Sequence, residues 1–300
     1  LDSGLYADVE GVHAHTKNTY KCHRIVLSYT SLFFRKLLED ENVHQVQVNF
    51  VDVDDVFPKL LKFLYSGKAE LTASNVVAMK VAANHFQVDM LTVAVEQFLD
   101  ANFTSENVFT ILDKSILCND ELVTKKAVGF IAKQFEKLYP QIQERVSTLP
   151  QQVFLSIIAH EHLKEQAEKR TKQVMVLVNE FIDKFKAMDN KDLLISVLDA
   201  VLASNTLNSD SATMFLVHCD KLGLSKQASG CAQVLAANFY TLSDKKFIFE
   251  LSANSFCSLL RSDDLFIKSE DSVFEIADEY VKKNDARLTL QQKQDIMQSV

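Results

Sequence analysis

Two histidine clusters and five cysteines are the residues of this 300-residue chain whose types and spacing suggest chemistry. His13 and His15 alternate on a predicted strand, so both imidazoles would face one side and could begin a metal site. Two ligands do not complete a zinc site, and we favour a structural or solvent-facing role for both. His160 and His162 flank Glu161, but this spacing differs from the HExxH pattern of a zinc protease.

Other patterns typical of catalysis are absent from the sequence. It has no glycine-rich phosphate loop and no GxSxG nucleophile turn. Asp52, Asp54 and Asp55 occur where a turn and a helix cap are expected, not as a catalytic carboxylate pair. The five cysteines are Cys22, Cys118, Cys219, Cys231 and Cys257. Their odd number, wide spacing and lack of a CxxC pair argue against a disulfide framework and favour a reducing compartment. We therefore expect no enzyme, no cofactor and no metal.

The composition indicates a helical globular protein. Hydrophobic residues make up 47% of the chain and charged residues 24%. The chain has 6 glycines and 3 prolines, so few residues favour turns. The net charge of −8 argues against a nucleic-acid-binding groove, which would need a basic surface. The basic run at residues 164–172 contains two glutamates, so we interpret it as a solvent-exposed helix face. No apolar run approaches the length of a membrane span. We expect an intracellular protein, cytoplasmic and/or nuclear, that binds neither nucleic acid nor membrane.

The first hundred residues combine short strands with helices. Alternating apolar residues predict strands at residues 6–12, 19–23 and 46–50. A helix at residues 55–65 carries an apolar face and ends at Gly67. Thr72 and Asp89 are expected to cap the two helices that follow.

From residue 104 onward every predicted element is a helix. Ser105 and Asp120 are expected as helix caps, and Pro150 suits a first helical turn. Ile111 and Leu112 belong to an apolar stripe that should face inward.

The second half of this helical region repeats the first. Ser105, Leu112, Ala132, Phe135 and Leu138 recur, at a spacing of 104, as Ser209, Leu216, Ala236, Phe239 and Leu242. Further matches continue in the same order after two short deletions. We therefore predict two tandem helical units, at about residues 105–184 and 209–300, joined by a helix at residues 192–203.

Three motifs near the N-terminus occur in combination. They are Ala7-Asp8-Val9, the turn CHRIVL at residues 22–27 with SLFF at 31–34, and FLYSG at residues 63–67. Together they resemble the signature of the BTB (POZ) domain. Residues 256–260 and 262–265 resemble the BACK extension that follows BTB domains in kelch-type adaptors.

The resemblance implies a mostly α fold class. An α+β BTB/POZ domain, with a small mixed sheet capped by helices, would precede an all-helical tandem BACK-like extension. We place the BTB domain at residues 1–101 and the first BACK-like unit at residues 102–190. The connecting helix and the second BACK-like unit would occupy residues 191–300.

The resemblance also implies partners. Many BTB adaptors dock on cullin-3 to bring a substrate to a ubiquitin ligase, through a hydrophobic residue, any residue and Glu just after the Ser-x-x-Phe helix. Leu37 and Glu39 occupy that place, where the leucine would fill an apolar pocket and the carboxylate would accept a charge-assisted bond. The first helix after the BTB domain would extend the contact through Asn107, Ile111 and Leu112.

BTB domains also pair with themselves, and Asp8, His23 and Arg24 belong to the matching signature. In the family, the residues that match Asp8 and Arg24 form a charged pair near the dimer face. For these two residues we favour a local ion pair that fixes the fold. A homodimer is implied, although only seven residues precede Asp8, where relatives carry a helix and strand exchanged between partners.

Two functions remain open. The first is a protein–protein interaction adaptor for a cullin-3 type E3 ubiquitin ligase, which uses the BTB domain for docking and oligomerisation and presents an unknown substrate protein. The alternative is a self-associating BTB scaffold, structural or transcriptional, with no ligase role.

Overall fold

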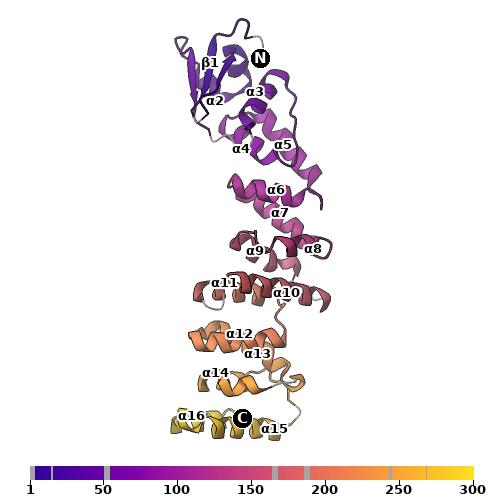
Figure 1. Cartoon of the computed structure of the whole chain (residues 1–300), viewed down its shortest axis with the longest axis vertical. Helices are drawn as coiled ribbons and strands as arrows, with labels where there is room; N and C mark the ends of the chain where they lie inside the picture. The colour runs from indigo at the N-terminus through magenta and orange to yellow at the C-terminus, as the bar shows by residue number, and fades with distance from the viewer. Residues whose placement is uncertain are drawn as a thin grey trace. The chain divides into compact units, whose positions relative to one another are not determined.

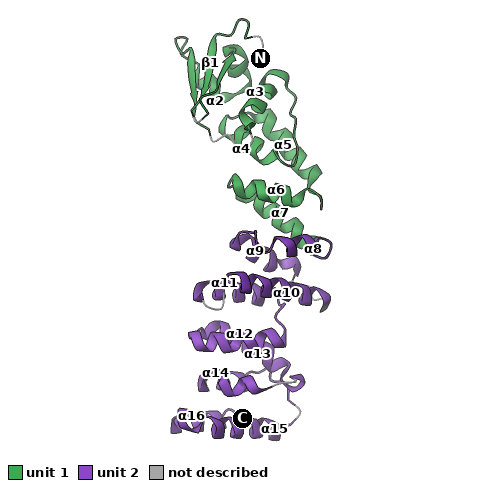
Figure 2. Cartoon of the chain, viewed as in Figure 1, with its two compact units in different colours: residues 1–134 green, residues 135–300 purple. Residues whose placement is uncertain are grey.

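The structure is a computed structural model that describes residues 4–14, 16–50, 55–163, 168–185, 190–242, 245–267 and 269–300. The chain forms two compact units, Leu1–Gln134 and Phe135–Val300, which Figure 2 distinguishes by colour. His15, Asp52 and Asp54 lie outside the described residues, as do residues 164–167 of the basic run.

A three-stranded mixed sheet opens the first unit. Its strands are β1 (Val9–His13), β2 (Thr19–Cys22) and β3 (Gln45–Val48), in the order β2-β1-β3. Strand β1 pairs antiparallel with β2 and parallel with β3. Val46 and Val48 of β3 are buried while Gln45 and Gln47 are exposed, as the alternation predicts. The three predicted strands are therefore confirmed, with ends displaced by a few residues.

Seven helices of the described residues complete the first unit (Figure 1). They are α1 (Arg24–Thr30), α2 (Leu32–Leu37), α3 (Val56–Ser66), α4 (Val76–His85), α5 (Asp89–Asn102), α6 (Val108–Leu117) and α7 (Glu121–Lys133). Their core is aromatic: the Phe86 ring stacks on Phe34 and lies 5.5 Å from that of Phe57. This core joins the sheet to α3 and α4 and fixes where α2 begins.

Two of the predicted helix ends are confirmed and two are wrong. Gly67, with φ 68°, ends α3, and the Asp120 carboxylate accepts a hydrogen bond from the Val123 N–H at the start of α7, so both predictions are confirmed. Thr72 is not a side-chain cap, since its own N–H donates to the Asn75 side chain and α4 starts one residue beyond Asn75. Asp89 is the first residue of α5, not its cap.

Ser105 was also wrongly predicted as a cap. Helix α6 begins after Asn107, and the loop before it is a turn whose Thr104 carbonyl accepts from the Asn107 and Val108 N–H groups. The backbone therefore supplies the bonds that a serine cap would have made.

The second unit contains only helices among its described residues (Figure 1). The α-helices are α8 (Phe135–Arg145), α9 (Gln151–Ile158), α10 (Glu168–Phe185), α11 (Lys191–Ala203), α12 (Ser209–Leu222), α13 (Ser225–Ala237), α14 (Ala253–Leu260), α15 (Glu270–Lys283) and α16 (Leu290–Met297). Short 3-10 helices are η2 (Glu161–Leu163), η4 (Phe239–Thr241), η5 (Lys246–Glu250) and η6 (Asp285–Arg287). Helix α9 starts one residue after Pro150, which precedes the helix instead of lying in its first turn.

The order of elements agrees with the predicted repeat. Each half has an α-helical pair, α6–α7 or α12–α13, and later a helix of eight residues, α9 or α14. Between them the first half has the α-helix α8, whereas the second has only the 3-10 helices η4 and η5. The longer helices α10 and α15 come next. The mostly α fold class is confirmed, while the domain boundaries at residues 101 and 190 stay predictions.

Candidate docking surface

Helix α2 is fixed at its start by Ser31. The Ser31 Oγ accepts from the Phe34 N–H at 3.1 Å and donates to the Phe86 carbonyl at 2.6 Å, which ties α2 to the end of α4. Phe34 and Leu38 then face the core, so Leu37 points outward and is 40% exposed. Glu39, one residue past the helix cap, is exposed. The two residues predicted for docking therefore lie on the surface, at and just beyond the end of a helix that packs against the core.

Arg24 holds the turn that carries Glu39. Its guanidinium donates to the carbonyl of Leu38 at 2.7 Å and to that of Asp40 at 3.1 Å. It also donates to the carbonyls of Glu41, at 3.2 Å, and Val43. One cation thus satisfies four backbone acceptors of residues 38–43, where no regular ladder exists to satisfy them.

The expected ion pair between Asp8 and Arg24 was wrong. The Asp8 carboxylate accepts from the backbone N–H of Arg24 at 2.7 Å, at the start of α1, while the guanidinium turns to the carbonyls. An aspartate beside the N-terminus of a helix is stabilised by the unpaired N–H groups there. Both residues therefore fix the local fold, and each does so through the backbone.

His23 connects three segments of the first unit. Its backbone N–H donates to the Tyr65 hydroxyl at 2.8 Å, and its ring Nδ1 lies 2.9 Å from the same hydroxyl. Its Nε2 lies 2.9 Å from the Leu5 carbonyl. Both ring nitrogens of His23 thus have a hydrogen-bond partner, one on α3 and one in the segment before β1. Burial raises the pKa of the adjacent Cys22 thiol to about 11.

The residues proposed on α6 divide by exposure. Asn107 precedes the helix and is half-buried, and its carbonyl accepts from the Ile111 N–H. Ile111 and Leu112 are fully buried, as the apolar stripe predicted. Their side chains pack inward and do not form part of the exposed surface, so a docked partner would meet α6 through other residues.

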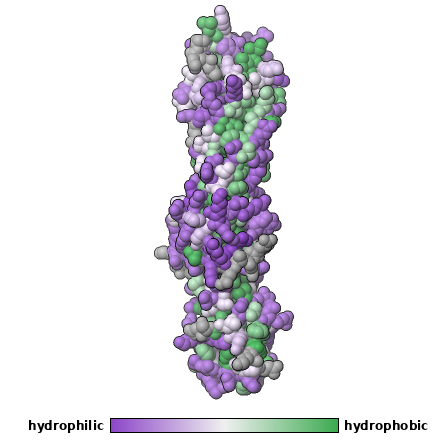
Figure 3. Space-filling model, turned by 90° about the vertical axis from the view of Figure 1, so that its right-hand side faces the viewer, coloured by the Kyte–Doolittle hydropathy of each residue, from purple (hydrophilic) through white to green (hydrophobic). Residues whose placement is uncertain are grey.

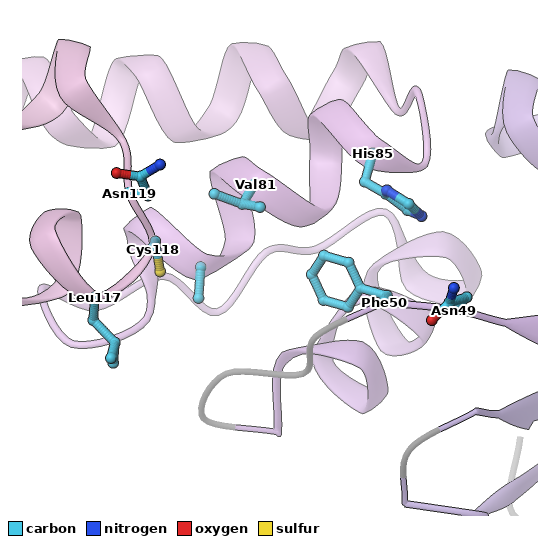
Figure 4. Close-up of a pocket in the computed structure, with 8 residues that line it drawn as sticks. Asn49, Phe50, Val81, His85, Leu117, Cys118 and Asn119 are labelled. Carbon is cyan, nitrogen blue, oxygen red and sulfur yellow. The ribbon is translucent and has the colours of Figure 1, made fainter.

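A cavity of 450 Å³ lies between the end of β3, α4 and the end of α6 (Figure 4). Asn49, Phe50 and His85 lie at one end of the view, and Leu117, Cys118 and Asn119 at the other. The lining is mainly apolar, with a few amide and imidazole groups, which is the usual character of a ligand or side-chain pocket. Partial burial lowers the pKa of His85 below its ordinary 6.5, which favours the neutral imidazole.

One wall residue of the cavity, His85, is in ring contact with Phe33 of α2. Phe33 and Leu37 are four residues apart on this helix, so they lie on one face. The Phe33 ring lies 5.5 Å from the His85 ring, which lines the cavity. The helix that carries Leu37 therefore contacts the wall of the cavity through Phe33.

Lys80 is a residue of this region that the sequence did not reveal. It is 8% exposed on α4, where its ammonium lies 3.0 Å from the Asp120 carboxylate and 3.7 Å from that of Glu96. Since Asp120 also caps α7, this buried cation links α4 to the helices that follow the sheet-containing part. A lysine in an apolar stripe is usually exposed, and only its place among Val76, Val77 and Ala83 hinted at burial.

A second apolar surface lies on α1. Ile25 and Tyr29 are four residues apart on this helix and are 78% and 83% exposed. Figure 3 shows hydrophobic residues reaching the surface in both units, whereas hydrophilic residues dominate around α8 to α10. Large exposed apolar side chains that recur on one helix face are typical of protein contacts.

The histidine clusters show no metal-like arrangement among the described residues, and no group of three or more His, Cys, Asp or Glu gathers there. His13 is buried and its Nδ1 accepts from the Thr16 N–H. His160 and His162 stack on each other with ring centroids 5.2 Å apart. In the described part of the basic run, Arg170 pairs with Glu136 at 3.1 Å. None of the described helices has the length and apolar character needed to cross a membrane.

The sheet, the surrounding helices and the motif at α1 and α2 define a BTB domain. The BTB/POZ domain family matches residues 1–103, and the BACK family (BTB And C-terminal Kelch) matches residues 212–300. The chain thus has the BTB–BACK architecture of kelch-type proteins.

Curated relatives agree with this architecture. Kelch-like protein 40 of Xenopus tropicalis is 25% identical over 160 residues, which are 52% of this chain and 26% of the relative. Kelch-like protein 41 of Homo sapiens is 26% identical over 152 residues, which are 49% of this chain and 25% of the relative. Kelch repeat and BTB domain-containing protein 8 of Xenopus tropicalis is 25% identical over 171 residues, which are 56% and 28% of the two chains. The matches therefore span about a quarter of each relative's length.

Proposed function

We propose that this chain is a protein–protein interaction adaptor that docks on a cullin-3 type scaffold. The observation that carries the proposal is the exposed pair Leu37 and Glu39 on a rigidly held helix end. Leu37 supplies an apolar anchor, and Glu39 supplies a carboxylate at its rim, which suits a cationic group of a partner.

The neighbouring cavity supports the same proposal. A partner that covers Leu37 and Phe33 would also approach the recess lined by Phe50, Val81 and His85, because the Phe33 ring lies 5.5 Å from the His85 ring. Apolar anchors beside a recess, surrounded by polar groups, are the arrangement found at the energetic centre of protein interfaces. Exposed groups of α6 then lie at the edge of the same surface, since Leu117 lines the recess.

The test is a calorimetric titration of the whole chain with the N-terminal domain of cullin-3. Glu39→Lys is expected to weaken binding on the order of a hundredfold, because it replaces an attraction by a repulsion at a central contact. Glu41→Lys is the matched control: it changes the net charge equally, two residues away on the same turn, and should leave affinity within a few-fold. Failure of the folded wild-type chain to bind at tens of micromolar would remove this function.

A self-associating scaffold is the second candidate, and the apolar strip on α1 favours it. Ile25 and Tyr29 present two large side chains to solvent, and a second copy would bury both. Light scattering should then show a dimer that Tyr29→Glu dissociates, while Glu39→Lys leaves it intact. A monomeric wild-type chain at micromolar concentration would count against this candidate.

A substrate protein would be held by the helical units of the chain or by segments beyond it. This part of the proposal rests on the BTB–BACK architecture alone, and pull-down of binding partners with the isolated chain tests it.

A further inference from the structure

A cavity of 350 Å³ lies between α10 and α12 of the second unit. Figure 1 shows these two helices in neighbouring layers of the unit. Each helix contributes three lining residues, which are Asn179, Ile182 and Asp183 of α10 and Asp210, Ser211 and Met214 of α12. Ligand cavities in proteins span about 300–1,000 Å³, so this one suits a single side chain or a small molecule better than a large cofactor.

The spacing of these residues gives the cavity two acidic groups and an apolar wall. Asn179 and Asp183 are four residues apart on α10, as are Asp210 and Met214 on α12, so each pair shares a helix face. Each helix thus presents one carboxylate beside one apolar side chain, Ile182 or Met214. Met214 is 37% exposed, so the apolar wall is open to a ligand.

Neither carboxylate of the cavity has a cationic partner. Asp183 and Asp210 form no ion pair and no side-chain hydrogen bond within the part of the chain that the structure describes. The adjacent Lys184 donates to the Ser147 carbonyl at 2.7 Å instead. Asp183 also lies in the last turn of α10, where the helix carbonyls disfavour a negative charge. Helix stability therefore accounts for Asp210, in the first turn of α12, but not for Asp183.

Ser211 is an independent sign of a ligand. It is 8% exposed, and its hydroxyl has no hydrogen-bond partner among the described residues, although it lines the cavity. Its backbone N–H donates to the Asn208 side chain at 2.9 Å, so only the hydroxyl is left over. A buried hydroxyl without a partner costs free energy. A donor group held in the cavity would remove that cost.

An arginine side chain has the chemistry that this cavity lacks. A guanidinium carries a fixed charge and five N–H donors, so it can donate to the two carboxylates and to the Ser211 hydroxyl together. Its aliphatic stem would pack on Met214 and Ile182. A metal ion is less suited, because those two side chains offer no oxygen ligand and no group of three or more His, Cys, Asp or Glu gathers among the described residues.

We propose that the cavity between α10 and α12 binds an arginine side chain of a partner protein. The inference rests on the part of the proposed function in which the helical units hold a substrate protein. Val176 is 42% exposed and precedes Asn179 by three residues, so it extends the same face of α10. The partner segment should therefore carry an apolar residue next to its arginine. The net charge of −8 favours the approach of such a basic segment.

The test is a titration of the whole chain with Nα-acetyl-arginine methylamide, followed by nuclear magnetic resonance of ¹³C-methyl methionine. Met214 reports on the cavity, and the exposed Met90 of α5 reports on non-specific effects. The Met214 signal, assigned with Met214→Leu, should shift and saturate in the millimolar range while that of Met90 stays in place. The citrulline analogue has nearly the same shape without the charge and should bind at least about tenfold more weakly. No shift at Met214, or an equal shift with citrulline, would overturn the proposal.

Matched variants separate the cavity from general charge attraction. Asp183→Asn and Asp210→Asn keep the shape of each side chain and should each weaken arginine binding about tenfold. Asp192→Asn removes an exposed carboxylate from the first turn of α11, outside the cavity, and should change affinity by less than about twofold. Circular dichroism shows whether each variant is folded. Equal weakening in all three variants would mean that the arginine is attracted only by the overall charge, and would refute the site.

A displayed library of random peptides tests whether the ligand belongs to a protein. The wild-type chain should enrich peptides that contain arginine beside an apolar residue, and the double variant Asp183→Asn/Asp210→Asn should not. Enrichment without arginine would contradict the proposal. Neither experiment contains cullin. A Met214 shift in a chain that fails to bind cullin-3 would support the cavity and remove the docking function, while docking without a shift would remove the cavity alone.

Discussion

Replacing Arg24 by alanine should both destabilise the first unit and abolish docking through Glu39. The guanidinium donates to four carbonyls of residues 38–43, so the variant leaves this turn without its donors. A hydrogen bond that involves a charged group contributes about 1.5–3 kcal/mol net to the stability of the folded protein. Arg24 is half-buried, and its bonds close a single turn, so they are not additive. We expect a loss of about 2–4 kcal/mol in the free energy of unfolding.

Urea unfolding followed by far-ultraviolet circular dichroism measures this loss, because the chain has no tryptophan to report by fluorescence. Arg24→Lys should recover less than half of it, since an ammonium is a point donor and cannot span four acceptors. Arg35→Ala is the control on the neighbouring helix: that guanidinium donates to Ser28 at 2.9 Å and Tyr29 at 3.5 Å, and we expect a loss below about 1 kcal/mol. An Arg24→Ala chain as stable as Arg35→Ala would refute the reasoning.

Three further outcomes are expected. Lys80→Met should lower the free energy of unfolding in urea by about 3 kcal/mol, because it leaves the Asp120 carboxylate buried without its cation. Lys62→Met removes an exposed ion pair and should change stability by less than about 1 kcal/mol. Equal losses in the two variants would contradict a stabilising role for the buried pair. Tyr280→Phe should cost about 1–2 kcal/mol, since the buried hydroxyl donates to the Leu251 carbonyl at 2.8 Å. Burial raises the pKa of Tyr280 from 10.0 to about 12, so the folded state keeps the phenol proton that the unfolded state loses. Stability should therefore fall as pH rises from 10.0 to about 12, and this fall should be smaller in Tyr280→Phe; an unchanged alkaline profile would count against the buried phenol.

Helix ends were predicted correctly where an apolar stripe is bounded by a residue whose own chemistry ends or begins a helix. Asp120 and Gly67 act as expected because one needs only a nearby N–H and the other only a left-handed conformation. Thr72 and Ser105 failed because the backbone of a preceding turn satisfies the same groups. Sequence shows which side chains could cap a helix, but not whether the main chain reaches those groups first.

The exposed residues of the candidate site were predictable from the sequence, but the buried and hydrogen-bonded residues that hold them in place were not. Leu37 and Glu39 were located by motif, and their exposure follows from the burial of Phe34 and Leu38 on the opposite face. Arg24 was predicted to pair with a carboxylate, because charge complementarity is visible in a sequence and backbone carbonyls are not. The burial of Ile111 and Leu112 was already implied by their stripe. The burial of Lys80 was not predicted, because its carboxylate partners belong to α5 and to the cap of α7, which are distant from it in the sequence.

The bond from Lys80 to the cap of α7 also determines where the BTB region can be cut. The family match ends at residue 103, yet the first compact unit continues through α7. A fragment that ends at residue 103 would keep Lys80 but lose its partner Asp120. It would also lack α6, which packs against α4. The amides of α4 and α7 should exchange with deuterium as one cooperative unit, opening together and not in sequence. We therefore expect the smallest fragment that folds as the first unit to include α6 and α7 and to end near Gln134, beyond the family match that ends at residue 103.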